Sequence, residues 1–244
     1  MSHKGNAHSP ARLAMLQWAA RLGAVTAPAL AQRDGCPVAS ARGRLQAAQR
    51  IGLLAASRPL TGVPTLYVPT RAGLLAAGSQ PEETSSITAS NAAHTATCAA
   101  VAAALERLYP DQLLTGERSL RRQEREHRGA LASAPLRSGI RGSQLHRPDL
   151  VLWPADRQCQ PLAVEVELTV KAPLRLLEIC RAWARCRCVS GVLYVISPEV
   201  ERPLGRAIDR ARARDRIAVL GLDAVGDAAQ DVGSPADGNV SSGG

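Results

Sequence analysis

The chain has 244 residues, enough for one large domain or two small ones. It contains 30 Lys and Arg against 21 Asp and Glu, and the resulting net charge of +9 favours an anionic partner such as nucleic acid or a membrane surface. Aromatic residues form only 2% of the chain, which argues against base stacking on aromatic side chains as the main mode of binding single strands. No segment reaches the ~18 consecutive apolar residues that a membrane span requires. The N-terminal stretch imitates a signal peptide, but Gln17 and Arg21 interrupt its apolar core. We therefore expect a cytoplasmic protein without a membrane partner.

The first 78 residues have the pattern of three helices, a hairpin and a closing helix. Thr26 and Pro28 form a helix start, and Gly23 and Gly35 form helix stops. The third helix is expected to bury Ala41, Leu45 and Ala48. The predicted helices cover residues 11–22, 26–35, 39–51 and 71–77, and the predicted strands cover residues 54–58 and 66–68.

This order, together with the exit of the third helix at residues 49–54, resembles a winged helix-turn-helix domain, which we assign to residues 10–78. The resemblance implies a recognition helix in the major groove of double-stranded DNA. Arg42 and Arg44 are the candidate residues for the groove, and Arg58 is the candidate for a backbone contact from the wing. The alternative is a small helical unit that binds another protein or holds a homodimer together.

A polar segment at residues 79–92 is the predicted linker to a second domain at residues 93–222. This domain opens with an Ala-rich helix in which His94 and Cys98 lie four residues apart. The pair could bind a metal ion, but core packing is the favoured interpretation. A strand around residues 113–120 is expected to contain Glu117, an additional candidate acid.

An Arg-rich insertion follows at residues 121–147. It is expected to be either a flexible arm that holds phosphates or a solvated loop, and the sequence does not separate these two alternatives.

The most informative stretch runs from Pro148 to Lys171. Residues 163–171 alternate strictly, with Val and Leu on one side and Glu165, Glu167 and Lys171 on the other, which is the period of a β-strand. Asp149 begins the preceding strand, and a short turn makes the two strands hairpin neighbours. Three carboxylates and one ammonium group are therefore expected to converge. The alternative is an ordinary antiparallel strand with one solvated face.

Such a cluster suits a hard divalent cation, which takes oxygen ligands. Asp149 and Glu165 are the candidate ligands of Mg²⁺ or Mn²⁺, and no small-molecule cofactor is expected. Glu167 would orient an attacking water and Lys171 would stabilise the developing charge. Pro148-Asp149 and Glu165-Val166-Glu167 resemble the signature of the PD-(D/E)xK nuclease superfamily, although Glu167 stands where lysine is usual.

The remaining pattern predicts a helix, a buried strand, an Arg-rich helix and a last strand, at residues 173–184, 189–196, 199–214 and 217–222. Residues 223–244 are expected to be disordered. Cys180, Cys186 and Cys188 could form a zinc site, but buried thiols are the favoured interpretation. The second domain thus has the element order of the restriction-endonuclease-like fold, and the chain is expected to combine an α+β and an α/β domain.

The whole arrangement, over roughly residues 10–222, resembles the replication-relaxation family of actinobacterial plasmids and integrative elements. The resemblance is carried by His94 and by residues 117–121, 147–149 and 165–171. It implies a DNA-binding protein of mobile-element replication or transfer. The sequence supports either a metal-dependent endonuclease that nicks DNA, or a non-catalytic accessory or transcriptional regulator with a degenerate nuclease fold. A weaker third interpretation is an adaptor between proteins without DNA contact.

Overall fold

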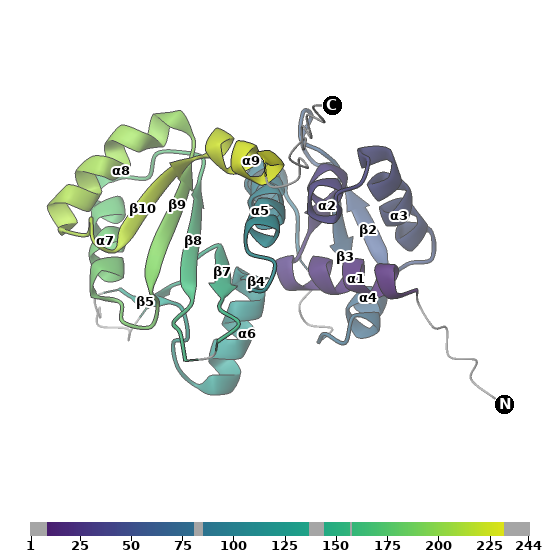
Figure 1. The fold of residues 1–244 in the computed structure, drawn as a ribbon, viewed down its shortest axis with the longest axis horizontal. Helices are drawn as coiled ribbons and strands as arrows, with labels where there is room; N and C mark the ends of the chain where they lie inside the picture. Colours follow the sequence, from purple (N-terminus) through teal and green to yellow (C-terminus); the bar gives the residue numbers. More distant parts are fainter. Residues whose placement is uncertain (1–8, 81–84, 137–143, 157, 232–244) are drawn as a thin grey trace, which may run out of the picture.

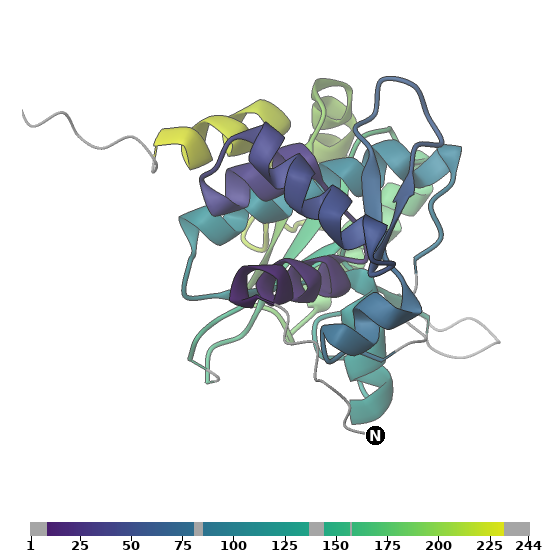
Figure 2. The same cartoon turned by 90° about the vertical axis from the view of Figure 1, so that its right-hand side faces the viewer.

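The N-terminal part of the computed structural model is a bundle of helices with a small antiparallel sheet. The structure describes residues 9–80, 85–136, 144–156 and 158–231. The elements of the N-terminal part are α1 (Pro10–Leu22), β1 (Val25–Thr26), α2 (Ala27–Asp34), α3 (Val38–Arg50), β2 (Leu54–Ser57), β3 (Leu66–Pro69) and α4 (Arg71–Ala76). The strands form a three-stranded sheet in the order β1-β3-β2, on which the helices pack (Figures 1 and 2).

The local signals in the sequence place the ends of these helices. Gly23 and Gly35 adopt left-handed backbone conformations, with φ of 88° and 60°, at the ends of α1 and α2. Thr26 Oγ1 accepts a hydrogen bond from the Ala29 amide at 3.2 Å and so caps α2. The expected buried side of α3 is confirmed, because Ala41, Leu45 and Ala48 are its buried residues.

The second part contains a five-stranded mixed sheet in the order β10-β9-β8-β7-β4. Strand β7 is antiparallel to both of its neighbours, whereas β8, β9 and β10 run parallel. Its elements are α5 (Ala89–Leu108), β4 (Leu113–Gly116), α6 (Glu117–His127), β5 (Ala134–Pro135), β6 (Leu145–His146), β7 (Leu150–Trp153), β8 (Leu162–Glu167), α7 (Pro173–Arg185), β9 (Gly191–Ile196), α8 (Pro198–Ala211), β10 (Ile217–Gly221) and α9 (Leu222–Asp231).

Helices cover both faces of this sheet. The apolar residues of α7 and α8 share one buried cluster with β7, β8 and β9, and those of α5 and α9 share another cluster on the opposite face (Figure 1). Side chains on either face of β8 are therefore removed from water. The chain is a mixed α/β protein with a helical N-terminal part, and no helix within the described ranges is long and apolar enough to cross a bilayer.

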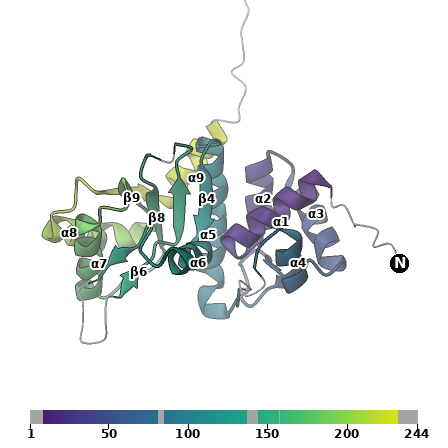
Figure 3. The same ribbon diagram turned by 90° about the horizontal axis from the view of Figure 1, so that it is seen from below.

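Helix α5 joins the two parts, since it lies between the N-terminal helices and the sheet (Figures 1 and 3). Ala99 and Ala103 belong to the N-terminal core, and Val101 and Leu105 belong to the core under the sheet. The predicted linker thus overlaps the start of a helix that both parts share. Residues 81–84 of that linker lie outside the described residues.

Three expectations from the sequence are wrong. The strand predicted at residues 113–120 ends at Gly116, and Glu117 begins helix α6. The insertion at residues 121–147 is neither an arm nor a loop where it is described, because it contains most of α6 and the short β5–β6 ladder. The tail expected to be disordered begins with α9, which packs on α5 and buries Val225, while residues 232–244 lie outside the described part.

Because α4 packs closely against Leu53, Gly73→Ala is expected to lower the free energy of unfolding. A Cβ atom at Gly73 would overlap the Leu53 carbonyl oxygen, a backbone atom that cannot turn aside. We expect a loss of roughly 1–3 kcal/mol in the free energy of unfolding. Gly43→Ala is the matched control, because a Cβ there meets nothing within 4 Å and Ala should stabilise α3 by about 0.5–1 kcal/mol. Urea denaturation measures both, and effects of the same sign would contradict this packing.

Candidate functional site

Asp149 directly precedes β7, at the end of the β7–β8 ladder beyond which Glu165 lies on β8. Leu150 pairs with Val164 in this antiparallel register, which, continued by one residue, places Asp149 across from Glu165. Asp149 Oδ2 also accepts a hydrogen bond of 2.8 Å from the Val166 amide. This bond holds the Asp149 side chain at the acidic strand.

Glu165 is buried, with 4% of its surface exposed, on the side of the sheet that α7 covers. Its Oε1 accepts a hydrogen bond of 3.1 Å from Trp183 Nε1 and lies 2.6 Å from His146 Nε2. Burial raises the pKa of Glu165, the nearby Asp149 charge adds to this rise, and His146 opposes it. A buried, perturbed carboxylate at the end of a sheet is a candidate functional group.

Sequence reasoning did not identify His146 and Trp183 as partners of Glu165. The available signal for His146 was its position in the sequence, three residues before the predicted site residue Asp149. Trp183 lies in the helix predicted at residues 173–184. The two rings meet edge to face with centroids 5.7 Å apart, so they form one support beneath the carboxylate.

Glu167 and Lys171 form an ion pair beside Glu165. Strand β8 ends at Glu167, so Lys171 lies in the segment that leads to α7 and not on the strand predicted through residue 171. Glu167 is only 6% exposed. The alternative of an ordinary solvated strand face is therefore wrong for both acids.

His94 approaches the same end of the sheet from α5. Its Nε2 lies 3.4 Å from Asp149 Oδ2 and 3.1 Å from the Val166 carbonyl oxygen. The hydrogen bond with Asp149 raises the pKa of His94, against the opposing effect of burial. Cys98 Sγ lies 3.7 Å from His94 Nδ1. Core packing is wrong for the His94 side chain, which is 39% exposed, whereas Cys98 does pack against the core under α5.

A cavity of about 220 Å³ opens next to these residues. Among its lining residues are His94, Cys98, Asp149 and Glu117. The Glu117 amide donates a hydrogen bond of 3.0 Å to the Asp149 carbonyl oxygen, which ties the start of α6 to the start of β7. The structure thus brings Glu117 next to Asp149, although from a helix, and its carboxylate forms an ion pair with Arg121.

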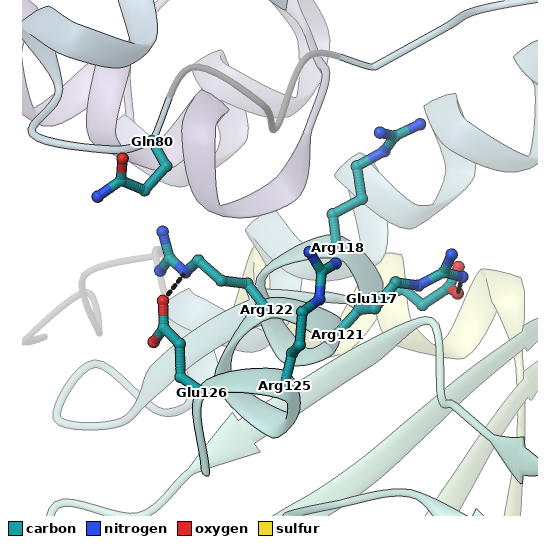
Figure 4. A pocket seen from close by; sticks show the side chains of 7 residues that line it. All are labelled: Gln80, Glu117, Arg118, Arg121, Arg122, Arg125 and Glu126. Atoms are coloured by element: carbon teal, nitrogen blue, oxygen red, sulfur yellow. Dashed lines mark hydrogen bonds and ion pairs between the residues drawn. The ribbon is translucent and has the colours of Figure 1, made fainter. Parts of the chain in front are cut away.

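A second cavity, of about 400 Å³, lies along α6 and is strongly basic. Figure 4 shows the side chains of Arg118, Arg122 and Arg125 extending from this helix. Arg122 is 3.7 Å from Glu126 in an ion pair. Glu117 and Arg118 line both cavities, so the basic surface of α6 is continuous with the cavity at Asp149.

A buried ion pair connects α6 to the strand that carries Asp149. Glu124 Oε2 lies 2.9 Å from Arg147 Nε, and Glu124 Oε1 accepts a hydrogen bond of 3.1 Å from the Leu131 amide. The Glu124 side chain is only 3% exposed. Because Arg147 directly precedes Pro148-Asp149, this pair fixes the position at which Asp149 enters the site.

The three arginines predicted to bind DNA have different surroundings. Arg42 is exposed on α3. Arg44 Nη1 lies 2.6 Å from Asp34 Oδ2, and Arg58 donates hydrogen bonds of 3.1 and 2.7 Å to Thr65 Oγ1. Arg42 is therefore the strongest of the three candidates, since the other two are engaged within the protein.

The atoms around Asp149 differ from the all-oxygen set expected for Mg²⁺. Among the described residues, the group of potential ligands close enough to hold an ion consists of His94, Cys98 and Asp149. Glu165 instead directs Oε1 at His146 and Trp183. The donor set at Asp149 thus contains nitrogen and sulfur, and does not fit a site of two carboxylates alone.

The C-terminal cysteines differ in their protonation and burial. Burial raises the pKa of Cys180 to about 12, so it remains protonated. Cys186 and Cys188 contact each other with their sulfur atoms 3.0 Å apart, and the hydrogen bond from Cys188 lowers the pKa of Cys186 to about 6. The favoured interpretation of buried thiols holds for Cys180 and Cys186.

Comparison with known proteins identifies no family. No family model and no curated protein matches the sequence. The structure is similar to the crystal structure of protein VC1899 from Vibrio cholerae, with 12% sequence identity and a TM-score of 0.34. The match covers 92% of this chain and 56% of that protein, so the chain spans little more than half its length. A similarity this distant carries no argument about function.

The Glu124–Arg147 pair predicts an unequal cost for two carboxylate deletions. Glu124→Ala leaves a partly buried guanidinium unpaired, and we expect it to lower the free energy of unfolding by about 3 kcal/mol. Glu178→Ala is the matched control, because Glu178 pairs with Arg175 at 2.8 Å with its side chain 42% exposed, and its loss should cost about 0–1 kcal/mol. Thermal and urea unfolding compare the two variants. Equal costs would show that the buried pair does not fix the α6–β7 junction.

Proposed function

We propose that the protein binds double-stranded DNA through residues 10–78 and nicks or cleaves it at Asp149 and Glu165 in a metal-dependent reaction. The observation that carries the proposal is the β7–β8 register, reinforced by the bond from the Val166 amide to Asp149. This register, continued by one residue, brings Asp149 close to Glu165, next to the Glu167–Lys171 ion pair. A buried Glu165 and a half-buried Asp149, with an adjacent acid and ammonium group, suit phosphodiester hydrolysis.

The order of elements supports the DNA-binding half of the proposal. A helix, a short strand, two helices and a two-stranded hairpin, with a sheet ordered β1-β3-β2, agree with a winged helix-turn-helix unit. In such a unit α3 is the recognition helix. Arg42, Gln46 and Arg50 are exposed on α3, on the side away from its buried alanines. The net charge of +9 favours the same kind of partner.

The sheet supports the nuclease half. In the order β4-β7-β8-β9-β10, the acidic strands are second and third, and only the second strand runs opposite to the rest. Helices on both faces complete the arrangement expected of a restriction-endonuclease-like domain. The basic cavity along α6 offers phosphate contacts next to Asp149, which suits a substrate strand that passes from α6 to the site.

The side chains around the site divide the chemical work. Glu167 would orient a water, and Lys171 would stabilise the charge that develops on the phosphate. His146 and Trp183 orient Glu165. A divalent ion, when bound, would polarise a phosphoryl oxygen, with Asp149 as its carboxylate ligand. The resemblance to the replication-relaxation family adds that this chemistry serves the replication or transfer of a mobile element.

A second function is favoured by one specific observation. Glu165 Oε1 already has two partners, and Lys171 already neutralises Glu167. A site satisfied in this way is consistent with a non-catalytic DNA-binding accessory or transcriptional regulator, in which the nuclease-like part only docks or dimerises. The cleavage experiment separates this function from the first.

Cleavage of supercoiled plasmid tests the site directly. We expect the wild type to convert supercoiled to nicked DNA with Mg²⁺ or Mn²⁺, each supplied separately after chelation. The Asp149→Asn and Glu165→Gln variants should cleave at least about 100-fold more slowly than the wild type, because a transition-state interaction is worth several kcal/mol. Glu178→Gln, which removes an exposed carboxylate from α7, should cleave like the wild type.

The outcome decides between the two functions. No cleavage by the wild type, with duplex binding intact, would establish the non-catalytic alternative. Cleavage retained by both site variants would place the chemistry elsewhere or in a contaminant. Loss of duplex binding at low salt would remove both functions and leave an adaptor between proteins.

Duplex binding measured across a range of salt concentrations tests the role of α3. Arg42→Ala should weaken binding several-fold and lower the slope of log K against log salt by about 1, as expected when one cation leaves the DNA interface. Arg206→Ala removes the same charge from an exposed position on α8, at the opposite end of the molecule (Figure 1), and should leave the slope unchanged. Equal losses in the two variants would indicate attraction by net charge alone.

A further inference from the structure

We infer that His94, Cys98 and Asp149 form a binding site for a thiophilic divalent ion, with zinc as the natural occupant. The inference concerns ion binding itself and goes beyond the proposed cleavage of DNA. It stands whether or not the protein hydrolyses a phosphodiester. It rests on the arrangement of these three side chains around one cavity.

The ligand atoms are already at coordinating separations. His94 and Cys98, four residues apart on α5, project from one side of the helix, and Asp149 faces them from the start of β7. Cys98 Sγ is 3.8 Å and Asp149 Oδ2 is 3.4 Å from His94 Nε2, and all three ligand atoms lie within 4.8 Å of one another. Tetrahedral zinc, with bonds of about 2.3 Å to sulfur and 2.0–2.1 Å to nitrogen or oxygen, separates its ligands by about 3.3–3.6 Å. Small side-chain rotations are enough to close the site.

The surroundings of the three ligands favour a cation. The cavity of about 220 Å³ that they line leaves room for an ion and for a water as a further ligand. The carboxylates of Asp149, Glu165 and Glu117 all lie close enough to act electrostatically on Cys98. The Val166 carbonyl oxygen, 3.1 Å from His94 Nε2, adds a neutral oxygen donor at the same point.

The donor chemistry selects the kind of ion. Mg²⁺ and Ca²⁺ take oxygen ligands, whereas a thiolate and an imidazole favour Zn²⁺ or Co²⁺. Binding must displace the proton of the Cys98 thiol, so one proton is released for each ion bound when His94 is neutral. The site therefore differs from the two-carboxylate magnesium site, with which it shares only Asp149.

Cobalt spectroscopy on the full-length, metal-free protein tests the inference without DNA. We expect one equivalent of Co²⁺ to produce a thiolate-to-cobalt charge-transfer band and the visible bands of a tetrahedral ion. One equivalent of Zn²⁺ should abolish these bands. Cys98→Ser should lose the charge-transfer band, and His94→Asn should lose tight binding, while circular dichroism shows that both variants remain folded.

The other thiols supply the control. Cys186 and Cys188 lie 3.0 Å apart and could bind cobalt themselves, so the double variant Cys186→Ser/Cys188→Ser must keep the full signal. Absence of the band in the wild type, its survival in Cys98→Ser, or its loss in the double variant would each overturn the site. Glu165→Gln should still bind cobalt, so failure of the nuclease proposal and failure of this site give different results.

Discussion

The fold depends on the small side chains of α5, which let one helix pack into two cores at once. Alanine combines the best helix propensity with the shortest side chain that retains a Cβ, so neighbouring elements can approach the helix closely. Ala99 and Ala103 contact the N-terminal helices, and Val101 and Leu105 lie under the sheet. Near the end of the helix, Glu106 pairs with Arg21 at 3.2 Å and with Arg33 at 2.8 Å. Larger residues on α5 would separate the two cores and carry His94 away from the sheet.

The acidic end of the sheet follows from that packing. With helices on both faces, the carboxylates of β8 are held out of water, which costs several kcal/mol unless other groups replace the lost hydration. Protein groups take the place of water around each carboxylate. His146 and Trp183 contact Glu165, Lys171 pairs with Glu167, and the Val166 amide donates a hydrogen bond to Asp149. A fold that served only stability could fill such positions with apolar residues. These acids are the observation on which the proposed chemistry at this edge rests.

Local signals in the sequence were sufficient for part of this structure. The alternation of residues 163–167 indicated β8, and Gly23, Thr26 and Gly35 marked helix ends, because such signals act within a few residues. Helix α6 escaped prediction because its apolar side consists of little more than Leu120, and its buried face includes the charged Glu124. Strand β1 has two residues, too few for any periodicity. Helix α9 was missed because its Asp- and Gly-containing sequence reads as disordered, although Val225 is buried on the sheet core.

The acids and Lys171 of the candidate site were predictable from the sequence, and most of the contacts that hold them were not. Asp149, Glu165 and Glu167 lie within one hairpin, so their spacing along the chain determined their neighbourhood. The partners of Glu165 come from 19 residues before it and 18 residues after it, on separate elements, and no local pattern joins them. His94 approaches from 72 residues away, and its distance from Val166 depends on how α5 crosses the sheet. Such contacts are products of tertiary packing.

Because α5 is shared, the two halves of the molecule are mechanically coupled. A helix moves as a rod, so a shift of the N-terminal helices against Ala99 and Ala103 also shifts His94 relative to Asp149. Events at α3 and at the sheet edge then share a coupling free energy, which by thermodynamic linkage has the same size in both directions. An occupant that tightens this 20-residue helix on one side would thereby change affinity on the other.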